Sequence, residues 1–211
     1  MFITIEGMDG SGKTTALQRV KKHLEDLNYK VVMTREPGGL PISEKIRDLI
    51  LNKDSQGMEP WTEALLFIAA RKEHVEKVIK PYLEQGYIVI SDRFMDSTTA
   101  YQGGARGLGV DYLNELQKTI LEGFLPDLTL YFELSFEDAE KRLSGRHDEK
   151  NRLDEEGRKF KESVKQAFED LSKKEAQRIT VIDASKTPDE VFEQTKNVIL
   201  EKIELWKKEK H

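Results

Sequence analysis

One glycine-rich segment near the start of the chain limits its possible folds more than any other feature. It fits the phosphate-loop pattern G-x-x-x-x-G-K-[ST], as Gly7-Met8-Asp9-Gly10-Ser11-Gly12-Lys13-Thr14. A strand-like apolar run precedes the segment and an apolar repeat at helical spacing follows it, so its context also fits. In such a loop backbone N–H groups surround phosphate oxygens, the lysine reaches the β- and γ-phosphates, and the threonine can bind Mg²⁺. The sequence therefore predicts binding of a nucleoside triphosphate with Mg²⁺.

Short apolar runs alternate with helical patterns along the chain, which is typical of a parallel sheet flanked by helices. The expected strands are 2–6, 30–34, 87–91, 128–133 and 179–183. The last helix is expected to begin with a capping box, in which Thr187 is the N-cap and Glu190 bonds back to it. We therefore expect an α/β fold, a doubly wound five-stranded parallel sheet in a single domain over residues 1–211.

Composition excludes several classes of protein. The 34 Lys and Arg residues nearly balance the 39 Asp and Glu residues, so bulk positive charge does not hold this chain on nucleic acid. There is no cysteine, which excludes disulfides, thiolate metal sites and a cysteine nucleophile. The longest apolar stretch, 64–70, is far too short to span a membrane. We expect a soluble, cytoplasmic protein with neither nucleic acid nor membrane as a partner.

Charged residues at the ends of two predicted strands indicate a second phosphate-bearing ligand. Asp92 follows the third strand, where it can hold a metal-bound water, and Arg93 comes next. Arg35 follows the second strand. Because the carboxyl ends of parallel strands meet at one edge of a sheet, both arginines should lie beside the phosphate loop, and guanidinium groups suit a second phosphate.

A polar stretch around 142–156 is almost without apolar residues and carries Arg142, Arg146 and Arg152. It is either a solvated loop or a lid whose arginines close over a transferring phosphoryl group and exclude water. A phosphate acceptor supplies its own ionised oxygen nucleophile, so an enzyme acting on it needs positive charge and alignment rather than a general base. This set of residues favours a kinase that acts on a phosphate.

Six segments of the chain resemble the thymidylate kinases, in the order typical of that family. They are GMDGSGKTT (7–15), TREPGG (34–39), LFIAAR (66–71), DRFMDSTTAYQGGARGLG (92–109), NRLDE (151–155) and VIDASKTP (181–188). The resemblance implies an enzyme that phosphorylates dTMP to dTDP in dTTP biosynthesis, with ATP as the donor and Mg²⁺ as the metal. It also implies a homodimer, with the helix over 60–82 as the interface.

The resemblance further implies how the base is bound. Phe67 would stack on the thymine and Arg71, four residues later, would donate to a base carbonyl. Thr98 and Gln102 would contact the base edge, and Tyr101 would occupy the place of a ribose 2′-hydroxyl. From the residues alone, Phe67 would be read as a core residue.

Phosphate contacts and catalytic groups also follow from the resemblance. The dTMP phosphate would lie among Arg35, Arg47 and Arg93, with Glu36 beside the nucleotide and a strained or cis bond before Pro37. Asp9 would meet the sugar 3′-hydroxyl or the metal, whose other expected ligands are Thr14 and Asp92. The phosphate loop has no arginine between its glycines, so the catalytic arginine would come from the lid and act with Lys13, Asp9 and Arg93. Arg146 or Arg152 is preferred for it, and Arg142 is a third candidate.

Two other functions stay open at this point. One is a kinase for a different monophosphate, against which Phe67, Arg71 and Gln102 argue. The other is a nucleotide-binding switch without catalytic activity, against which Arg35, Arg93 and the lid arginines argue, because a switch has no second phosphate substrate to bind.

Overall fold

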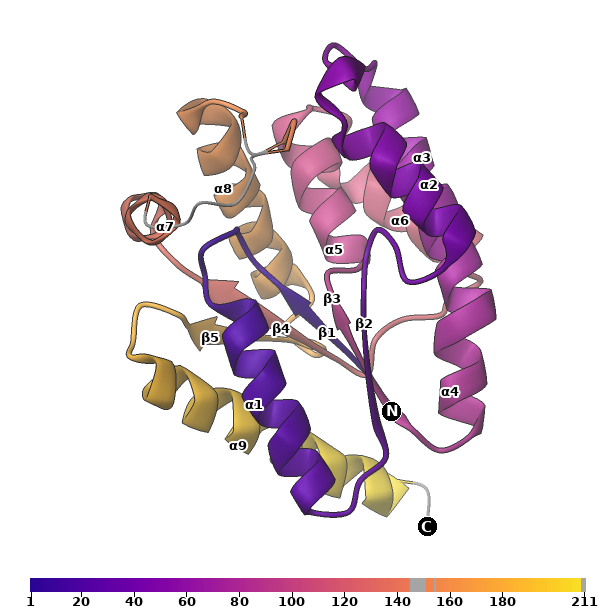
Figure 1. The fold of residues 1–211 in the computed structure, drawn as a ribbon, viewed down its shortest axis with the longest axis vertical. Helices are drawn as coiled ribbons and strands as arrows, with labels where there is room; N and C mark the ends of the chain where they lie inside the picture. Colours follow the sequence, from indigo (N-terminus) through magenta and orange to yellow (C-terminus); the bar gives the residue numbers. More distant parts are fainter. Residues whose placement is uncertain (145–150, 154, 210–211) are drawn as a thin grey trace.

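Five parallel strands form one sheet in the order β2-β3-β1-β4-β5, as seen in the computed structural model of the chain (Figure 1). The structure describes residues 1–144, 151–153 and 155–209. The strands are β1 (Phe2–Glu6), β2 (Val31–Arg35), β3 (Ile88–Asp92), β4 (Leu128–Glu133) and β5 (Ile179–Asp183). The central strand β1 is buried along its whole length, as expected of a parallel strand covered on both faces. The predicted α/β fold is confirmed.

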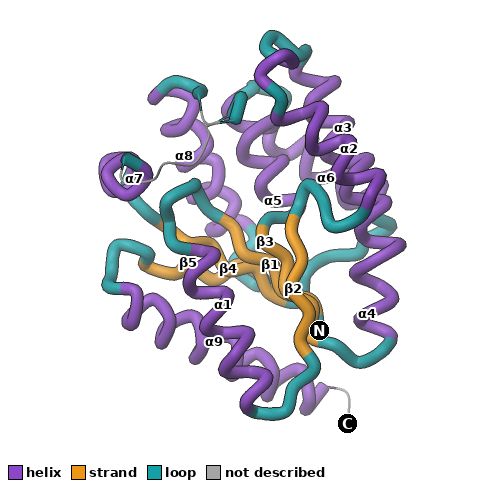
Figure 2. Tube along the Cα trace, viewed as in Figure 1, coloured by secondary structure: helices purple, strands orange, loops and turns teal. Residues whose placement is uncertain are grey.

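Helices cover both faces of the sheet (Figure 2). The α-helices are α1 (Lys13–Asp26), α2 (Pro41–Leu51), α3 (Pro60–His74), α4 (Lys80–Glu84), α5 (Met95–Thr98), α6 (Val110–Ile120), α7 (Phe136–Leu143), α8 (Arg158–Lys174) and α9 (Pro188–Glu209). Three shorter helical segments are η1 (Lys53–Ser55), η2 (Val75–Ile79) and η3 (Thr99–Ala105). Helices α1 and α9 lie together on one face, and α4, α5, α6 and α8 lie on the other.

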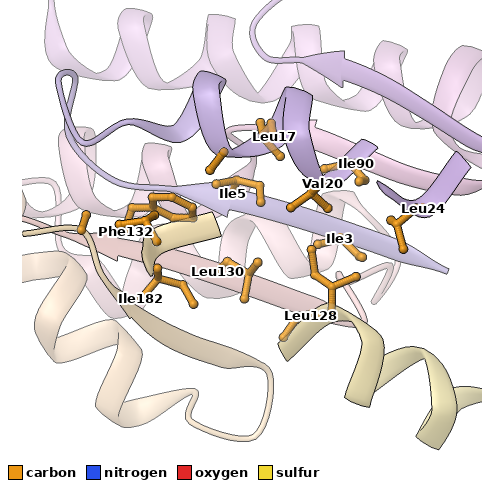
Figure 3. Packing of buried hydrophobic residues seen from close by; sticks show 14 of the residues in the cluster. Ile3, Ile5, Leu17, Val20, Leu24, Ile90, Leu128, Leu130, Phe132 and Ile182 are labelled. Atoms are coloured by element: carbon orange, nitrogen blue, oxygen red, sulfur yellow. The ribbon is translucent and has the colours of Figure 1, made fainter. Parts of the chain in front are cut away.

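Alternation of side chains along the strands places the core on both faces of the sheet. On β1, Ile3 and Ile5 point toward α1 and α9 (Figure 3). Phe2 packs in the core on the opposite face. Leu17 and Val20 of α1 pack on the first group. This packing holds the carboxyl end of β1 in place, and the phosphate loop begins there.

Element boundaries agree closely with the sequence prediction, with a few shifts. Strands β2 and β3 begin and end one residue later than predicted, because Arg35 and Asp92 still pair in register at the strand ends. The capping box of α9 is confirmed: Glu190 N donates to Thr187 Oγ1 (3.3 Å) and Thr187 N donates to Glu190 Oε2 (3.0 Å). The helix expected over 60–82 is interrupted by the π-helical segment η2.

The predicted lid falls partly outside the described residues, and Arg146 lies among those not described. Residues 151–153 lie against the end of α2, where Arg152 N donates to Leu51 O (3.2 Å). Across the described part of the chain, no helix has the length and apolar composition needed to cross a lipid bilayer.

Candidate active site

The phosphate loop connects β1 to α1, and two of its glycines are required by their surroundings. Gly7 has φ 136° and Gly10 has φ 85°, which is a backbone region that favours glycine. A Cβ atom on Gly7 would lie 2.7 Å from Phe132 O, and one on Gly10 would lie 2.8 Å from Ala139 O. The turn can therefore pack this tightly only without side chains at these two positions.

Lys13 is folded over the loop. Its Nζ donates to Gly7 O (2.9 Å) and Met8 O (2.8 Å), and its side chain is almost completely buried. Burial, with the nearby Arg93 acting in the same direction, lowers the pKa of Lys13 to about 8. Incoming phosphate oxygens would replace the two carbonyls and stabilise the charged ammonium.

Two buried polar atoms beside the loop have no hydrogen-bond partner among the described residues. They are Ser11 Oγ in the loop and Asp92 Oδ1 at the end of β3. Buried polar atoms are rarely left unsatisfied, so these atoms fit a site that phosphate oxygens and a hydrated cation complete. The described residues contain no cluster of three metal-ligating side chains.

A cavity of about 170 Å³ joins the phosphate loop to the ends of β2 and β3. Its lining residues are Asp9, Gly10, Gly12, Lys13, Thr14, Arg35, Glu36, Arg47, Asp92 and Arg93. Arg35 and Arg47 both donate to Pro37 O, each at 2.9 Å. The structure therefore brings the arginines predicted from two strand ends together beside the loop, with Arg47 of α2 as a third. The Glu36–Pro37 peptide bond is cis, as expected.

Arg93 is held in an unusual backbone conformation, with φ 68°. Its guanidinium donates to Asp9 Oδ1 (2.7 Å) and Ser97 Oγ (3.1 Å), and it lies 5.4 Å from the centre of the Tyr101 ring. Although burial acts to lower it, the pKa of Arg93 is raised by Tyr101, Asp9 and Asp92 around it. The group is a permanent cation aimed at the phosphate loop.

Glu6, the last residue of β1, fixes the loop that carries Arg93. Its Oε1 accepts from Phe94 N (2.8 Å) and Ser97 N (3.3 Å), and its Oε2 lies 2.5 Å from Ser97 Oγ. Burial raises the pKa of Glu6 to about 8, and the nearby carboxylate of Asp96 acts in the same direction. The sequence prediction assigned no role to Glu6.

A larger cavity of about 980 Å³ adjoins the first and shares Asp9, Glu36, Arg47 and Arg93 with it. Nearly all residues predicted to bind the acceptor line it, namely Glu36, Pro37, Arg47, Phe67, Arg71, Arg93, Thr98, Tyr101 and Gln102. Arg35 lines only the smaller cavity. The two cavities together could hold two phosphorylated ligands whose phosphates meet at the arginines.

Arg71 is completely anchored in the wall of the larger cavity. Its Nε donates to Glu36 Oε2 (2.7 Å), and its Nη2 donates to Phe94 O (2.9 Å). Its Nη1 donates to Thr98 Oγ1 (3.1 Å) and to Gln117 Oε1. Among the described residues, four of the five N–H groups of the guanidinium have an acceptor, and one N–H on Nη2 has none. Thr98, which also lines this cavity, accepts the hydrogen bond from Arg71 through its hydroxyl.

His74 and Glu63 are buried site residues to which the sequence prediction gave no role. His74 Nδ1 lies 2.8 Å from Glu36 Oε1, and its Nε2 lies 2.7 Å from Thr34 Oγ1. Glu63 bonds to Gln102 (2.8 Å). A signal for them exists in their spacing, since Glu63, Phe67, Arg71 and His74 recur at intervals of four, four and three on one helix face.

The candidate lid arginines that the structure describes, Arg142 and Arg152, do not line the cavity at the phosphate loop. Arg152 is buried, and its guanidinium donates to Glu63 Oε2 and Ile50 O. Arg142 is exposed in the last turn of α7. Neither lines either of the two cavities.

Comparison with known proteins identifies close relatives. The family model described as thymidylate kinase matches residues 5–195. A thymidylate kinase of Mesoplasma florum is 89% identical over 210 residues, covering 100% of both chains. One from Mycoplasma capricolum is 58% identical and covers 96% of both chains. The crystal structure of thymidylate kinase from Ehrlichia chaffeensis superposes with a TM-score of 0.76 at 35% identity, covering 95% of this chain and 98% of that one.

Proposed function

The chain belongs to the thymidylate kinase family and is a kinase that acts on dTMP, and on that premise we propose that it transfers the γ-phosphoryl group of ATP, with Mg²⁺, to give dTDP and ADP. The observation that carries the proposal is the pair of adjoining cavities. One contains the phosphate loop and Arg35, the other contains an aromatic and polar wall, and Arg47 and Arg93 line both.

In the proposed reaction an oxygen of the dTMP phosphate bonds to the γ-phosphorus while the bond from that phosphorus to the β–γ bridging oxygen breaks. Arg35, Arg47 and Arg93 would hold the acceptor phosphate and Lys13 would neutralise charge on the donor. Since the acceptor oxygen is already ionised, no base is required. Thr14 and Asp92, with Asp9 as a further candidate, would hold Mg²⁺, which supplies charge neutralisation at the phosphate oxygens when bound.

Recognition of the base is supported by complementary polar groups in the larger cavity. Arg71 retains one N–H for a carbonyl oxygen, and Phe67 offers a ring on which a base can stack. Tyr101, whose ring lies beside Arg93, would exclude a ribose 2′-hydroxyl. Gln102 lines the same cavity and would contact the base edge.

We assign the lid arginine to Arg146 in preference to Arg152. Arg152 would have to leave Glu63 to reach the phosphates, and Arg142 lies exposed on α7. We expect Arg146→Ala to lower kcat by about 10²-fold or more with a smaller change in KM, because it would act on charge that develops in the transition state. Steady-state kinetics at saturating ATP test this, and an effect on KM alone would contradict the assignment.

A homodimer is the assembly that we propose. Ile42 and Leu49 on α2 and Leu65 on α3 are each about half exposed and lie on neighbouring helices. Such a group of apolar side chains is typical of an interface. The expected interface on 60–82 would thus include α2 as well. We place the enzyme in the cytoplasm, where both nucleotides are available.

The proposed reaction is tested by following ATP and dTMP in the presence of Mg²⁺ by phosphorus NMR. We expect ADP and dTDP to form in equal amounts, and Lys13→Ala to abolish both. Formation of ADP with no dTDP would overturn the proposal, because it would show hydrolysis instead of transfer.

A further inference from the structure

Glu63 is a completely buried carboxylate behind the wall of the larger cavity. Its Oε1 accepts from Gln102 Nε2 (2.8 Å) and Arg106 Nε (3.1 Å). Its Oε2 accepts from Arg106 Nη2 (3.3 Å) and from Arg152 Nη2. Three residues from η3, its C-terminal end and the segment 151–153 thus converge on one side chain of α3.

This environment keeps Glu63 ionised. Burial acts to raise the pKa of Glu63, but the hydrogen bonds from Arg106, Gln102 and Arg152 outweigh it and hold the pKa below its ordinary value. An ionised carboxylate only accepts hydrogen bonds. The end of the Gln102 amide that faces Glu63 must therefore be the NH₂ group.

The opposite end of that amide has a defined role as a result. Gln102 lines the larger cavity with Arg71 and Phe67, and among the described residues its only side-chain hydrogen bond is the one to Glu63. Its carbonyl oxygen is therefore the group left to accept a bond from a ligand, and Arg71, which lines the same cavity, still offers one N–H. Thymine and uracil carry an O4 acceptor next to an N3–H donor, which matches this pair. Cytosine carries a donor and an acceptor in the opposite order.

We propose that Glu63 is a positioning residue that makes the enzyme select pyrimidine monophosphates carrying an N3–H group over those of cytosine, by fixing the amide of Gln102. The inference rests on the proposed function and deepens it. Arg106 and Arg152 act through Glu63, because they balance its charge. Arg152 therefore has a part in acceptor selection even where it lies away from the transferring phosphoryl group.

The test compares kcat/KM for dTMP, dUMP, dCMP and N3-methyl-dTMP in the wild type, Glu63→Gln and the control Glu156→Gln. Glu156 bonds to Arg106 (2.5 Å) in the same cluster, and no contact joins it to Gln102. In Glu63→Gln the amide of Gln102 can turn over, so we expect the dTMP:dCMP ratio to fall about tenfold or more. In this variant kcat/KM for dUMP should fall together with that for dTMP. N3-methyl-dTMP has no N3–H, so its kcat/KM should already be low in the wild type and should not fall further in Glu63→Gln. Glu156→Gln should keep the wild-type ratio within about twofold.

An equal loss for dTMP, dUMP and dCMP in Glu63→Gln would overturn the proposal, since a merely structural role lowers all three alike. An unchanged dTMP:dCMP ratio would also overturn it. The wild-type measurement tests the proposed function separately. If the wild type does not prefer dTMP, both the proposed function and the role of Glu63 are wrong. If the wild type prefers dTMP and Glu63→Gln prefers it equally, only the role of Glu63 is wrong. Should thermal unfolding show that Glu63→Gln is unfolded, Glu63→Asp keeps the charge opposite the arginines but is one methylene short of Gln102, and the same fall in the ratio is expected.

Discussion

Arg93 combines a strained backbone with three fixed side-chain neighbours. A non-glycine residue at φ 68° is uncommon and persists only where its surroundings over-determine it. Here Glu6 accepts from the next backbone N–H, and Ser97 and Asp9 hold the guanidinium. The direction of the guanidinium is thus set before a ligand arrives, which lowers the entropic cost of binding a phosphate.

Replacing Arg93 with alanine should therefore impair use of the acceptor. We expect Arg93→Ala to lower kcat/KM for dTMP by about 10²-fold or more, with most of the loss in KM, because a charge-assisted contact to the phosphate is removed. Initial-rate kinetics measure this. Arg19→Ala is a suitable control, because Arg19 on α1 forms an ion pair with Asp189 on α9 (2.8 Å) and lines neither cavity. It should change kcat/KM less than twofold. Unchanged kinetics in Arg93→Ala would contradict the assigned phosphate site.

Lys13 should make ATP binding depend on pH. Its pKa in the free enzyme is lowered to about 8, so it is charged below about pH 8 and loses its charge above it. Bound phosphates favour the ammonium, and the dissociation constant of ATP should therefore rise above about pH 8, by up to tenfold per pH unit. Titration calorimetry between about pH 7 and pH 9.5 tests this, with Lys13→Arg as a control that binds more weakly but without that rise. A flat profile in the wild type would contradict the prediction.

The site residues fall into two groups, those that a motif or strand end marks in the sequence and those whose role depends on contacts distant in sequence. Lys13, Thr14, Arg35, Asp92 and Arg93 were predictable, because the phosphate-loop pattern and two strand ends mark them in the sequence. Glu6, Glu63 and His74 were not assigned roles, since single polar residues give no sign of burial. Their contacts are long-range: Glu6 bonds to Phe94, and Glu63 bonds to Arg152. Such contacts are set by tertiary packing. The helical spacing that Glu63 and His74 share with Phe67 and Arg71 indicates a common helix face but not which residues they contact.

Among the elements, the loop from β3 to α5 depends most on a single buried acid from β1. Glu6 is fully buried and accepts from the backbone N–H groups of Phe94 in the loop and Ser97 in α5. Because its pKa is raised from 4.5 to about 8, its contribution to stability is fully present below about pH 4.5 and is lost as the pH rises through 8. The loop should be least stable at alkaline pH.

Glu6→Gln should remove this pH dependence, because the amide can donate to Ser97 Oγ and accept from the loop but cannot ionise. Between about pH 6 and pH 8 we expect the unfolding free energy of the wild type to fall relative to the variant by about 1–3 kcal/mol. Urea unfolding at several pH values measures the difference. As a control, Glu25→Gln changes an exposed residue of α1, and its unfolding free energy should differ from that of the wild type by the same amount at each pH. A constant difference for Glu6→Gln as well would contradict the role of burial.

Elements with strong local signals were predicted almost to the residue. Strands β1, β4 and β5 match their expected ranges, and the capping box marks the start of α9. The π-helical segment η2 within the predicted helix over 60–82 was not predicted, because its side chains continue an apolar helical pattern and the change concerns backbone bonding alone.

Half-exposed apolar side chains lie on more than one side of the described part of the molecule, and those on α2 and α3 lie on adjacent helices that also line the acceptor cavity. Helix α3 carries Phe67 and Arg71 toward the cavity and Leu65 outward. An interface formed there would brace the helix that reads the base. Dimerisation and acceptor binding would then be coupled through α3.

Leu65→Arg should separate the proposed dimer, because burying an unpaired charge in an apolar interface is unfavourable. Light scattering after size exclusion should give twice the 24.3 kDa of one chain for the wild type and 24.3 kDa for the variant. Leu205→Arg on α9 is the matched control, being similarly exposed on the other side of the sheet, and should stay dimeric. A wild type that is monomeric, or a dimeric Leu65→Arg, would contradict this interface.

The measurement that tests the central claim most directly is ADP release from ATP and Mg²⁺ with dTMP, dUMP, dCMP, dGMP, ribothymidine monophosphate and AMP offered one at a time. The adjoining cavities, the arginines between them and the acceptor wall predict ADP release that depends strongly on dTMP and falls for the ribose and cytosine nucleotides. Preference for another monophosphate would contradict the assigned base site while leaving phosphoryl transfer in place. ADP release that none of these nucleotides stimulates would contradict the kinase itself.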